Sequence, residues 1–207
     1  MVNHVFAQDV KNIDTALINT LHKRAEKIVA PLGIQKSKTR NKVTDIVTQQ
    51  YMTLNEVQQF KESTIKKIKS SVVAGDTSIK SQIAGVEGKA SAITQKAHKQ
   101  YLKKLSRKIS QDQVEQIKNG MTYNVAPNTF KGYQEMLPAL TEVQKVQIWN
   151  WLVEAREIAM DAETSDKKHW WFGKYKGRIN NYLAAEGYDL KKEGKAWAER
   201  LANKNAK

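Results

Sequence analysis

Residues 141–187 read TEVQKVQIWNWLVEAREIAMDAETSDKKHWWFGKYKGRINNYLAAEG, and this stretch decides the fold of the chain. Apolar side chains recur in it at three- and four-residue steps, which predicts two amphipathic helices over about 142–162 and 166–186. The connection Glu163–Thr164 is so short that the two helices must pack antiparallel. The residues expected in the seam between them are Ile148, Leu152, Ala155, Ala159, Ile179 and Leu183.

Helix boundaries are marked in this stretch and elsewhere by capping residues. Thr141 and Gln144 have the spacing of a capping box, and so do Ser110 and Gln113, which open a short helix that ends at Gly120. Further start positions are predicted at Asp14 for a helix over about 15–32, at Ser37 for a long helix broken at 74–76, at Ser165 or Asp166, and near Asp189. The prediction is an all-α fold of about six to eight helices, with long N-terminal helices and a C-terminal antiparallel bundle.

Two segments carry a weak helical signal. In Thr77–Gln95, Gly85 and Gly88 each cost a helix about 1 kcal/mol relative to Ala, so we expect a mobile or bent region before the signal recovers at Ser91. Residues 121–134, MTYNVAPNTFKGYQ, show no periodicity. They predict a long ordered loop over Tyr123–Tyr133, with a short helix at its end.

Composition excludes several classes of protein. The 207 residues include only 3 Pro and 10 Gly, fewer than a β-sandwich or a collagen needs for its turns or repeats. There is no Cys, so disulfides, Cys-ligated zinc and thiol nucleophiles are excluded. The four His are scattered, and the metalloprotease, P-loop, dinucleotide and serine-hydrolase motifs are absent. We therefore expect no metal and no cofactor, and no apolar stretch is long enough to predict a membrane span.

The net charge of +14 is concentrated in the middle of the chain. Residues 36–110 hold 16 Lys and Arg against 5 Asp and Glu. Such a block indicates an acidic partner (nucleic acid, anionic lipid or anionic polysaccharide), or simply a solvated helix surface. Lys greatly outnumbers Arg, which favours the solvated helix surface, because specific phosphate and base contacts rely on guanidinium groups.

We interpret residues 1–207 as one domain with two differing parts. Residues 9–109 form a basic half of long helices, and residues 110–207 form an aromatic-rich half. Residues 1–8 resemble the end of a signal peptide, because Val5 and Ala7 occupy the small-residue positions before a cut at Gln8. This remnant predicts export.

Four of the five Trp lie within residues 149–171, and Trp170 and Trp171 are adjacent. Two neighbouring residues of a helix cannot both point inward, so one indole is expected at the surface, although the aromatic cluster as a whole can simply be core packing. An exposed indole beside cationic side chains suits stacking on a sugar ring or a nucleic-acid base, with the cations holding an acidic group. The predicted ligand-binding residues are Tyr123, Asn124, Tyr133, His169, Trp170, Lys174 and Arg178.

Carboxylates at Glu154, Glu157 and Asp161 share one face of the preceding helix. A pair of carboxylates can act as the acid and base of a glycosidase, but a regular polar stripe is more typical of the solvated side of a helix.

The runs GMTYNV (120–125) and FKGYQEMLPALTEVQKVQIWNWLVEAREIAMDAETSDKKHWWFGKYKGRINNYLAAEGYDLKK (130–192) resemble a family catalogued as domain of unknown function 3826. The resemblance covers about residues 110–192. It implies exported all-helical proteins of Bacteroidetes-type bacteria, whose genes accompany those of polysaccharide-degrading enzymes. It implies no reaction and no catalytic residues.

Together these observations predict an exported accessory or binding protein for polysaccharides, with anionic chains such as pectic ones as the partner. One alternative is an enzyme, a lyase or hydrolase, acting on the same polymers, with His169, Lys174 and Arg178 as the base and the charge-neutralising groups. Another is a purely structural or protein-interaction module. Nucleic acid is not the expected partner, and the sequence does not predict an oligomeric state.

Overall fold

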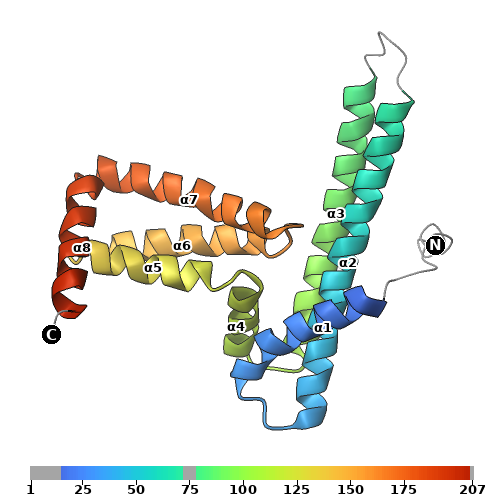
Figure 1. The fold of residues 1–207 in the computed structure, drawn as a ribbon, viewed down its shortest axis with the longest axis horizontal. Helices are drawn as coiled ribbons and strands as arrows, with labels where there is room; N and C mark the ends of the chain where they lie inside the picture. Colours follow the sequence, from blue (N-terminus) through green and yellow to red (C-terminus); the bar gives the residue numbers. More distant parts are fainter. Residues whose placement is uncertain (1–14, 72–77, 206–207) are drawn as a thin grey trace. The chain divides into compact units, whose positions relative to one another are not determined.

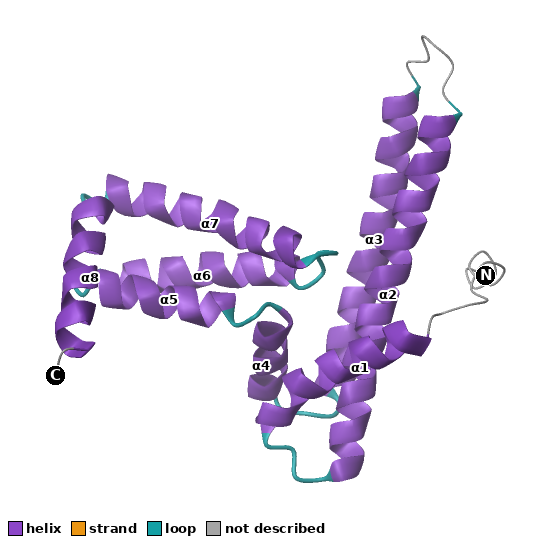
Figure 2. Cartoon of the chain, in the orientation of Figure 1, coloured by secondary structure: helices purple, strands orange, loops and turns teal. Residues whose placement is uncertain are grey.

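A computed structural model describes residues 15–71 and 78–205 of the chain. The predictions on Val5–Gln8, on the Asp14 cap and on the break at 74–76 lie outside these residues. The described part is built of helices and contains no strand, which confirms the all-α prediction (Figure 2). The elements are α1 (Thr15–Val29), the short 3₁₀ helix η1 (Ala30–Leu32), α2 (Ser37–Ser70), α3 (Ile79–Ser106), α4 (Gln111–Met121), α5 (Val125–Met136), α6 (Glu142–Ala159), α7 (Ser165–Ala185) and α8 (Leu190–Asn205).

The chain divides into two compact units, residues 1–114 and 115–207. The boundary falls inside α4, close to the predicted division between the basic half and the aromatic-rich half. The interpretation of both halves as one domain stays a prediction. The two units are called unit 1 and unit 2 below.

Unit 1 is dominated by α2 and α3, which pack side by side along most of their length, with α1 against α2 (Figure 1). Its core combines Ala, Val and Leu side chains with two tyrosines, and α2 also buries polar residues there. Gly33 ends η1 in the left-handed conformation, with φ of 64°, directly after the helix predicted over about 15–32. The most buried core residues are Ala25, Val29, Val43, Val47, Leu105 and Val114.

The structure corrects the prediction for residues 77–95. α3 begins at Ile79 and runs without interruption through Gly85 and Gly88 to Ser106. Val86 and Ala90 are buried, so contact with α2 supports the helix where the local propensity is poor. The predicted bend is therefore wrong, and the predicted mobility of this segment stays a prediction.

Unit 2 is organised around the antiparallel pair of α6 and α7 (Figure 1). All six residues predicted for their seam have no exposed surface, which confirms the packing prediction. The Thr141–Gln144 capping box at the start of α6 is present, with both of its hydrogen bonds formed. The cap of α7 is Thr164 rather than Ser165 or Asp166, because the Thr164 hydroxyl accepts from the Lys167 N–H at 3.1 Å.

The predicted loop over Tyr123–Tyr133 is wrong, because α5 begins at Val125 and packs on α6. Pro127 lies in the first turn of α5, where a helix has no use for its N–H, so this residue does not interrupt the helix. The irregular part is confined to Thr122, Tyr123 and Asn124, and the last two have φ of 57° and 56°. This left-handed pair turns the chain between α4 and α5.

The last helix, α8, contacts α5 and α7 (Figure 1). Arg200 Nη2 donates to the carbonyl oxygens of Glu135 at 2.9 Å and Met136 at 3.2 Å, which satisfies the C-terminal end of α5. Gly132 of α5 faces the Trp197 ring, since a Cβ built on it would lie 4.0 Å from the indole. Side chains of α8 and the end of α5 are therefore fitted to one another.

Candidate functional site

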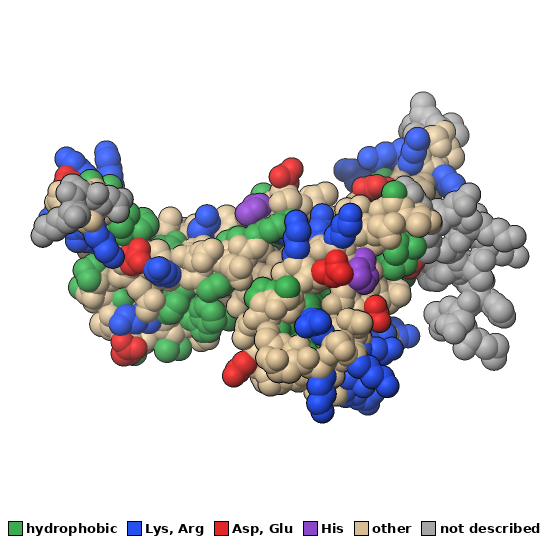
Figure 3. Space-filling view, turned by 60° about the horizontal axis from the view of Figure 1, so that its bottom comes forward, with side chains coloured by type: hydrophobic (Ala, Val, Ile, Leu, Met, Phe, Trp, Pro, Cys, Tyr) green, Lys and Arg blue, Asp and Glu red, His purple; other side chains and the backbone are tan. Residues whose placement is uncertain are grey.

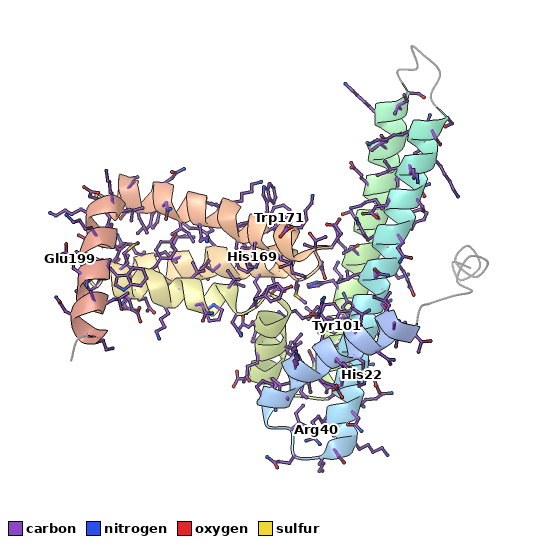
Figure 4. The ribbon with its side chains drawn as sticks, in the orientation of Figure 1. His22, Arg40, Tyr101, His169, Trp171 and Glu199 are labelled. Carbon is purple, nitrogen blue, oxygen red and sulfur yellow. The ribbon has the colours of Figure 1, made fainter. Side chains whose placement is uncertain are left out.

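Helix α7 carries four of the seven predicted site residues, and their side chains leave it in different directions. With about 100° between successive residues, Phe172, Ile179 and Leu183 share the face that is buried against α6. His169 lies at one border of that face and Trp171 at the other, and Figure 4 shows them on different sides of the helix. Trp170 points away from the core and is 57% exposed.

Tyr123 and His169 form an aromatic stack. Their ring centroids are 5.5 Å apart and the planes differ by 8°, while Tyr123 remains 47% exposed. The left-handed backbone at Tyr123 turns the chain from α4 into α5 at this point, and the tyrosine ring there meets the fifth residue of α7. The structure thus brings together two of the predicted site residues that are 46 positions apart.

Trp170, Trp171 and Lys174 form a second group, named here the indole–lysine patch. The Lys174 Nζ lies 5.6 Å from the Trp170 ring centroid and 5.4 Å from that of Trp171. The two indoles meet edge to face at 4.8 Å. Trp171 is half-buried and Trp170 is exposed, which confirms the prediction that one of the two lies at the surface. The patch offers a flat apolar face and an ammonium group to the same ligand.

Arg178 is already engaged by neighbours of its own. Its guanidinium carbon lies 4.6 Å from the Trp151 ring centroid, and its Nη1 is 3.5 Å from Glu154 Oε2. Nine residues separate it from His169, which places the two on roughly opposite sides of α7. Arg178 therefore supports the α6–α7 surface and does not converge with His169 on one reacting group.

Tyr133 belongs to the core rather than to a surface site. Its hydroxyl donates to Asn180 Oδ1 at 2.6 Å, and its ring is buried between α5 and α7. Burial raises the pKa of this phenol to about 12. Asn124 is exposed beside Tyr123 and makes no capping hydrogen bond. Of the seven predicted residues, the structure pairs Tyr123 with His169 and Trp170 with Lys174.

A buried ionic cluster between α4 and α6 escaped the sequence predictions. Arg156, with 1% of its surface exposed, donates from Nη1 to Asn119 Oδ1 at 2.7 Å and from Nη2 to Glu115 and Glu157. Lys118 Nζ completes the cluster at 3.0 Å from Glu115 Oε1 and 3.2 Å from Glu157 Oε1. Two cations and two carboxylates balance, so the buried charges are compensated.

The charged groups of this cluster pair with one another, and the pairing lowers the pKa of Glu115. Partial burial alone would raise the pKa of Glu115, but hydrogen bonds from Lys118 and Arg156 outweigh it and lower that pKa below its usual value. Glycoside hydrolysis needs a carboxylic acid whose pKa is raised, so Glu115 has the opposite tuning. Glu157, predicted on a solvated stripe, instead takes part in the cluster. The available signal was Arg156 itself, a charge four residues after the inward-facing Leu152.

The described residues offer neither a metal site nor a membrane-spanning helix. They contain no group of three or more His, Asp or Glu side chains placed to hold a metal ion. None of the described helices is both long and apolar enough to cross a lipid bilayer.

The chain was compared with curated proteins and with the sequence profiles of protein families. No curated protein matches the chain. The sequence profile of one family matches residues 18–203, a wider span than the resemblance over 110–192 indicates, since it includes the long basic helices of unit 1. The chain therefore belongs to the family described as "Protein of unknown function (DUF3826)".

Proposed function

We propose that this protein is a carbohydrate-binding accessory protein that holds acidic polysaccharide through the indole–lysine patch. The observation that carries the proposal is the Trp170 ring, 57% exposed, with the Lys174 ammonium group 5.6 Å from its centroid. An indole face packs well against the apolar face of a pyranose ring, and an ammonium group pairs with a carboxylate on that ring.

The neighbouring side chains favour binding over catalysis. A lyase needs a base and a charge-neutralising group on one reacting centre, within hydrogen-bond reach. His169 stacks on Tyr123, whereas Arg178 is paired with Glu154 on roughly the opposite side of α7. Since these groups do not converge, stacking and charge pairing are the chemistry that the surface supports.

Isothermal titration with polygalacturonate tests the proposal, with an uncharged glucan of similar length as the comparison polymer. Wild type should bind polygalacturonate saturably and the glucan more weakly. Trp170→Ala should lower the affinity at least about tenfold, the loss of one stacking contact of about 1.4 kcal/mol. Lys174→Gln should reduce the preference for the acidic polymer over the glucan.

Two matched controls accompany these variants. Leu201→Ala removes another exposed apolar side chain, and Lys176→Gln removes another exposed lysine of α7. Both should bind like wild type, and urea unfolding should show that all four variants remain folded. If wild type binds no glycan saturably, or if Trp170→Ala binds as tightly as Leu201→Ala, the proposed function is wrong.

A further inference from the structure

Helix α3 of unit 1 carries an unusually one-sided set of charges. Its 28 residues include six Lys and no Arg, against the single acid Glu87. Four of the lysines, at positions 89, 96, 99 and 103, are separated by seven, three and four residues, so they follow one line along the helix. They are all exposed, on the side away from buried Val86, Ala90, Tyr101 and Leu105. This row, named here the lysine row, extends over about 21 Å.

The lysine row has no internal compensation. None of its four ammonium groups forms an ion pair with a described residue, whereas Lys118 of α4 and Lys145 of α6 are paired with glutamates. Like charges three and four residues apart, as at Lys96, Lys99 and Lys103, destabilise a helix by a few tenths of a kcal/mol each. The folded chain thus gains nothing from the row, and a bound anion would relieve the repulsion. Figure 3 shows Lys and Arg side chains in blue and Asp and Glu side chains in red.

We propose that the lysine row is a second binding surface, separate from the indole–lysine patch, for an extended polymer of carboxylated sugars. A linear array of ammonium groups matches a linear array of carboxylates, and each ammonium is a point charge that requires no fixed orientation of its partner. The proposal shares its ligand class with the proposed function but rests on different residues in the other unit.

Two other polyanions fit the lysine row less well. A helix that lies on a lipid surface needs large apolar side chains beside its basic residues, and the exposed residues between the lysines are small or polar, as Ala92 and Gln100 illustrate. Phosphate and base recognition in nucleic acids relies on Arg and on exposed aromatic rings, and α3 has no Arg and buries Tyr101.

The test compares two triple variants of equal charge change. One replaces Lys96, Lys99 and Lys103 by Gln, and the control replaces the exposed lysines 191, 192 and 195 of α8. Binding of polygalacturonate is measured at 50 and 200 mM NaCl, with duplex DNA and anionic lipid vesicles as comparison probes. The α3 variant should bind polygalacturonate about tenfold more weakly at 50 mM and show a smaller salt dependence, because fewer counterions are exchanged. The α8 variant should change less than about threefold.

Equal losses in the two triple variants would mean that only net charge matters and would overturn the lysine row as a site. Tighter binding of DNA or vesicles than of polygalacturonate, lost in the α3 variant, would overturn the choice of ligand. The two proposals fail separately. Trp170→Ala should leave the salt-dependent part of binding in place, so an inert Trp170→Ala beside an affected α3 variant rejects the proposed function alone.

Discussion

The two antiparallel helix pairs, α2–α3 and α6–α7, reach the same arrangement with different side chains. The α6–α7 seam contains large aliphatic residues and Phe172, all fully buried, with aromatic rings at its borders. The α2–α3 pair is longer but buries polar side chains: Thr44, Thr48 and Gln50 have 4–6% of their surface exposed. Thr48 satisfies its own hydroxyl by donating to the Thr44 carbonyl oxygen at 2.9 Å. The α2–α3 pair is stabilised by the length of its contact, and the α6–α7 pair by the density of its apolar packing.

The two units also differ in where their charged side chains lie and whether they are paired. In unit 2 the buried cations are balanced by carboxylates or carbonyls: Arg156 by Glu115 and Glu157, and Lys168 by the carbonyl oxygens of Ala159 and Met160 at 2.8 and 2.9 Å. In unit 1 the lysine row is exposed and has no ion pair with a described residue. Buried, paired charge fixes a structure, whereas exposed charge of one sign is available to a partner.

The largest expected effect comes from removing the centre of the ionic cluster. Arg156→Met leaves Glu115, Glu157 and Lys118 with one cation too few, and loss of one partner from a buried ion pair costs about 3–5 kcal/mol. Urea unfolding should show this loss. Arg178→Met, which removes an exposed ion pair, is the matched control and should cost less than about 1 kcal/mol. Equal losses would mean that the buried ionic cluster stabilises the fold no more than an exposed ion pair does.

Tyr133→Phe removes the part-buried hydrogen bond to Asn180 and should cost about 1 kcal/mol at neutral pH. The folded-state pKa of Tyr133, about 12, lies above its ordinary value of 10.0. Its contribution to stability is therefore intact below pH 10 and is lost as the pH rises through about 12. The free energy of unfolding should depend less on pH between about pH 9 and pH 11 in Tyr133→Phe than in Tyr123→Phe. The second variant removes the hydroxyl of an exposed ring. The same alkaline slope in both variants would contradict this assignment.

Gly85→Ala and Gly88→Ala should each stabilise the protein by about 0.5–1 kcal/mol. Both glycines lie inside α3, and a Cβ built on either meets no atom within 4 Å, so the gain in helix propensity has no steric opposition. Amide hydrogen exchange in α3 should slow in the double variant if this segment is the mobile part of the α2–α3 pair. Gly173→Ala in α7, with the same open surroundings, is the comparison. A loss of stability in the α3 variants would show that these glycines have another role.

Glu56→Gln should give the smallest effect. Partial burial raises the pKa of Glu56 on α2, so its charged form is disfavoured in the folded state. Its contribution to stability is present below the ordinary pKa and is lost as the pH rises through the raised value, the reverse of Glu115. The variant should therefore be more stable than wild type at pH 7, by less than about 0.5 kcal/mol. A stability difference that does not change between about pH 4 and pH 7 would contradict this.

Local periodicity predicted much of the fold. The α6–α7 pair, its six seam residues and both capping boxes depend on residues close in sequence, and all of them are confirmed. The helix α5 was missed because Pro127, Asn128 and Gly132 are individually poor helix residues. Packing against α6 and α8 outweighs that local preference, as packing against α2 does at Gly85 in α3.

The candidate site likewise contains contacts that local spacing predicts and contacts that it does not. The four-residue spacing of Trp170 and Lys174 predicts their contact, since both lie on one helix. The choice between Tyr123 and Tyr133 could not be made from the sequence, because it depends on the left-handed turn at Tyr123 and Asn124. Arg156 finds its partners Glu115 and Asn119 at separations of 41 and 37 residues, and no local pattern encodes such a pairing.

The contact of α8 with α5 sets the order in which the helices of unit 2 can pack during synthesis. α5 is synthesised first, yet its last carbonyl groups and the surface at Gly132 are completed only by Arg200 and Trp197. Until those residues leave the ribosome, α5 to α7 can pair with one another but one end of α5 stays uncovered. Closure therefore depends on a contact made across 65 residues, and such long-range contacts form slowly. A nascent chain that has not yet released residues 190–207 from the ribosome would leave that end of α5 uncovered.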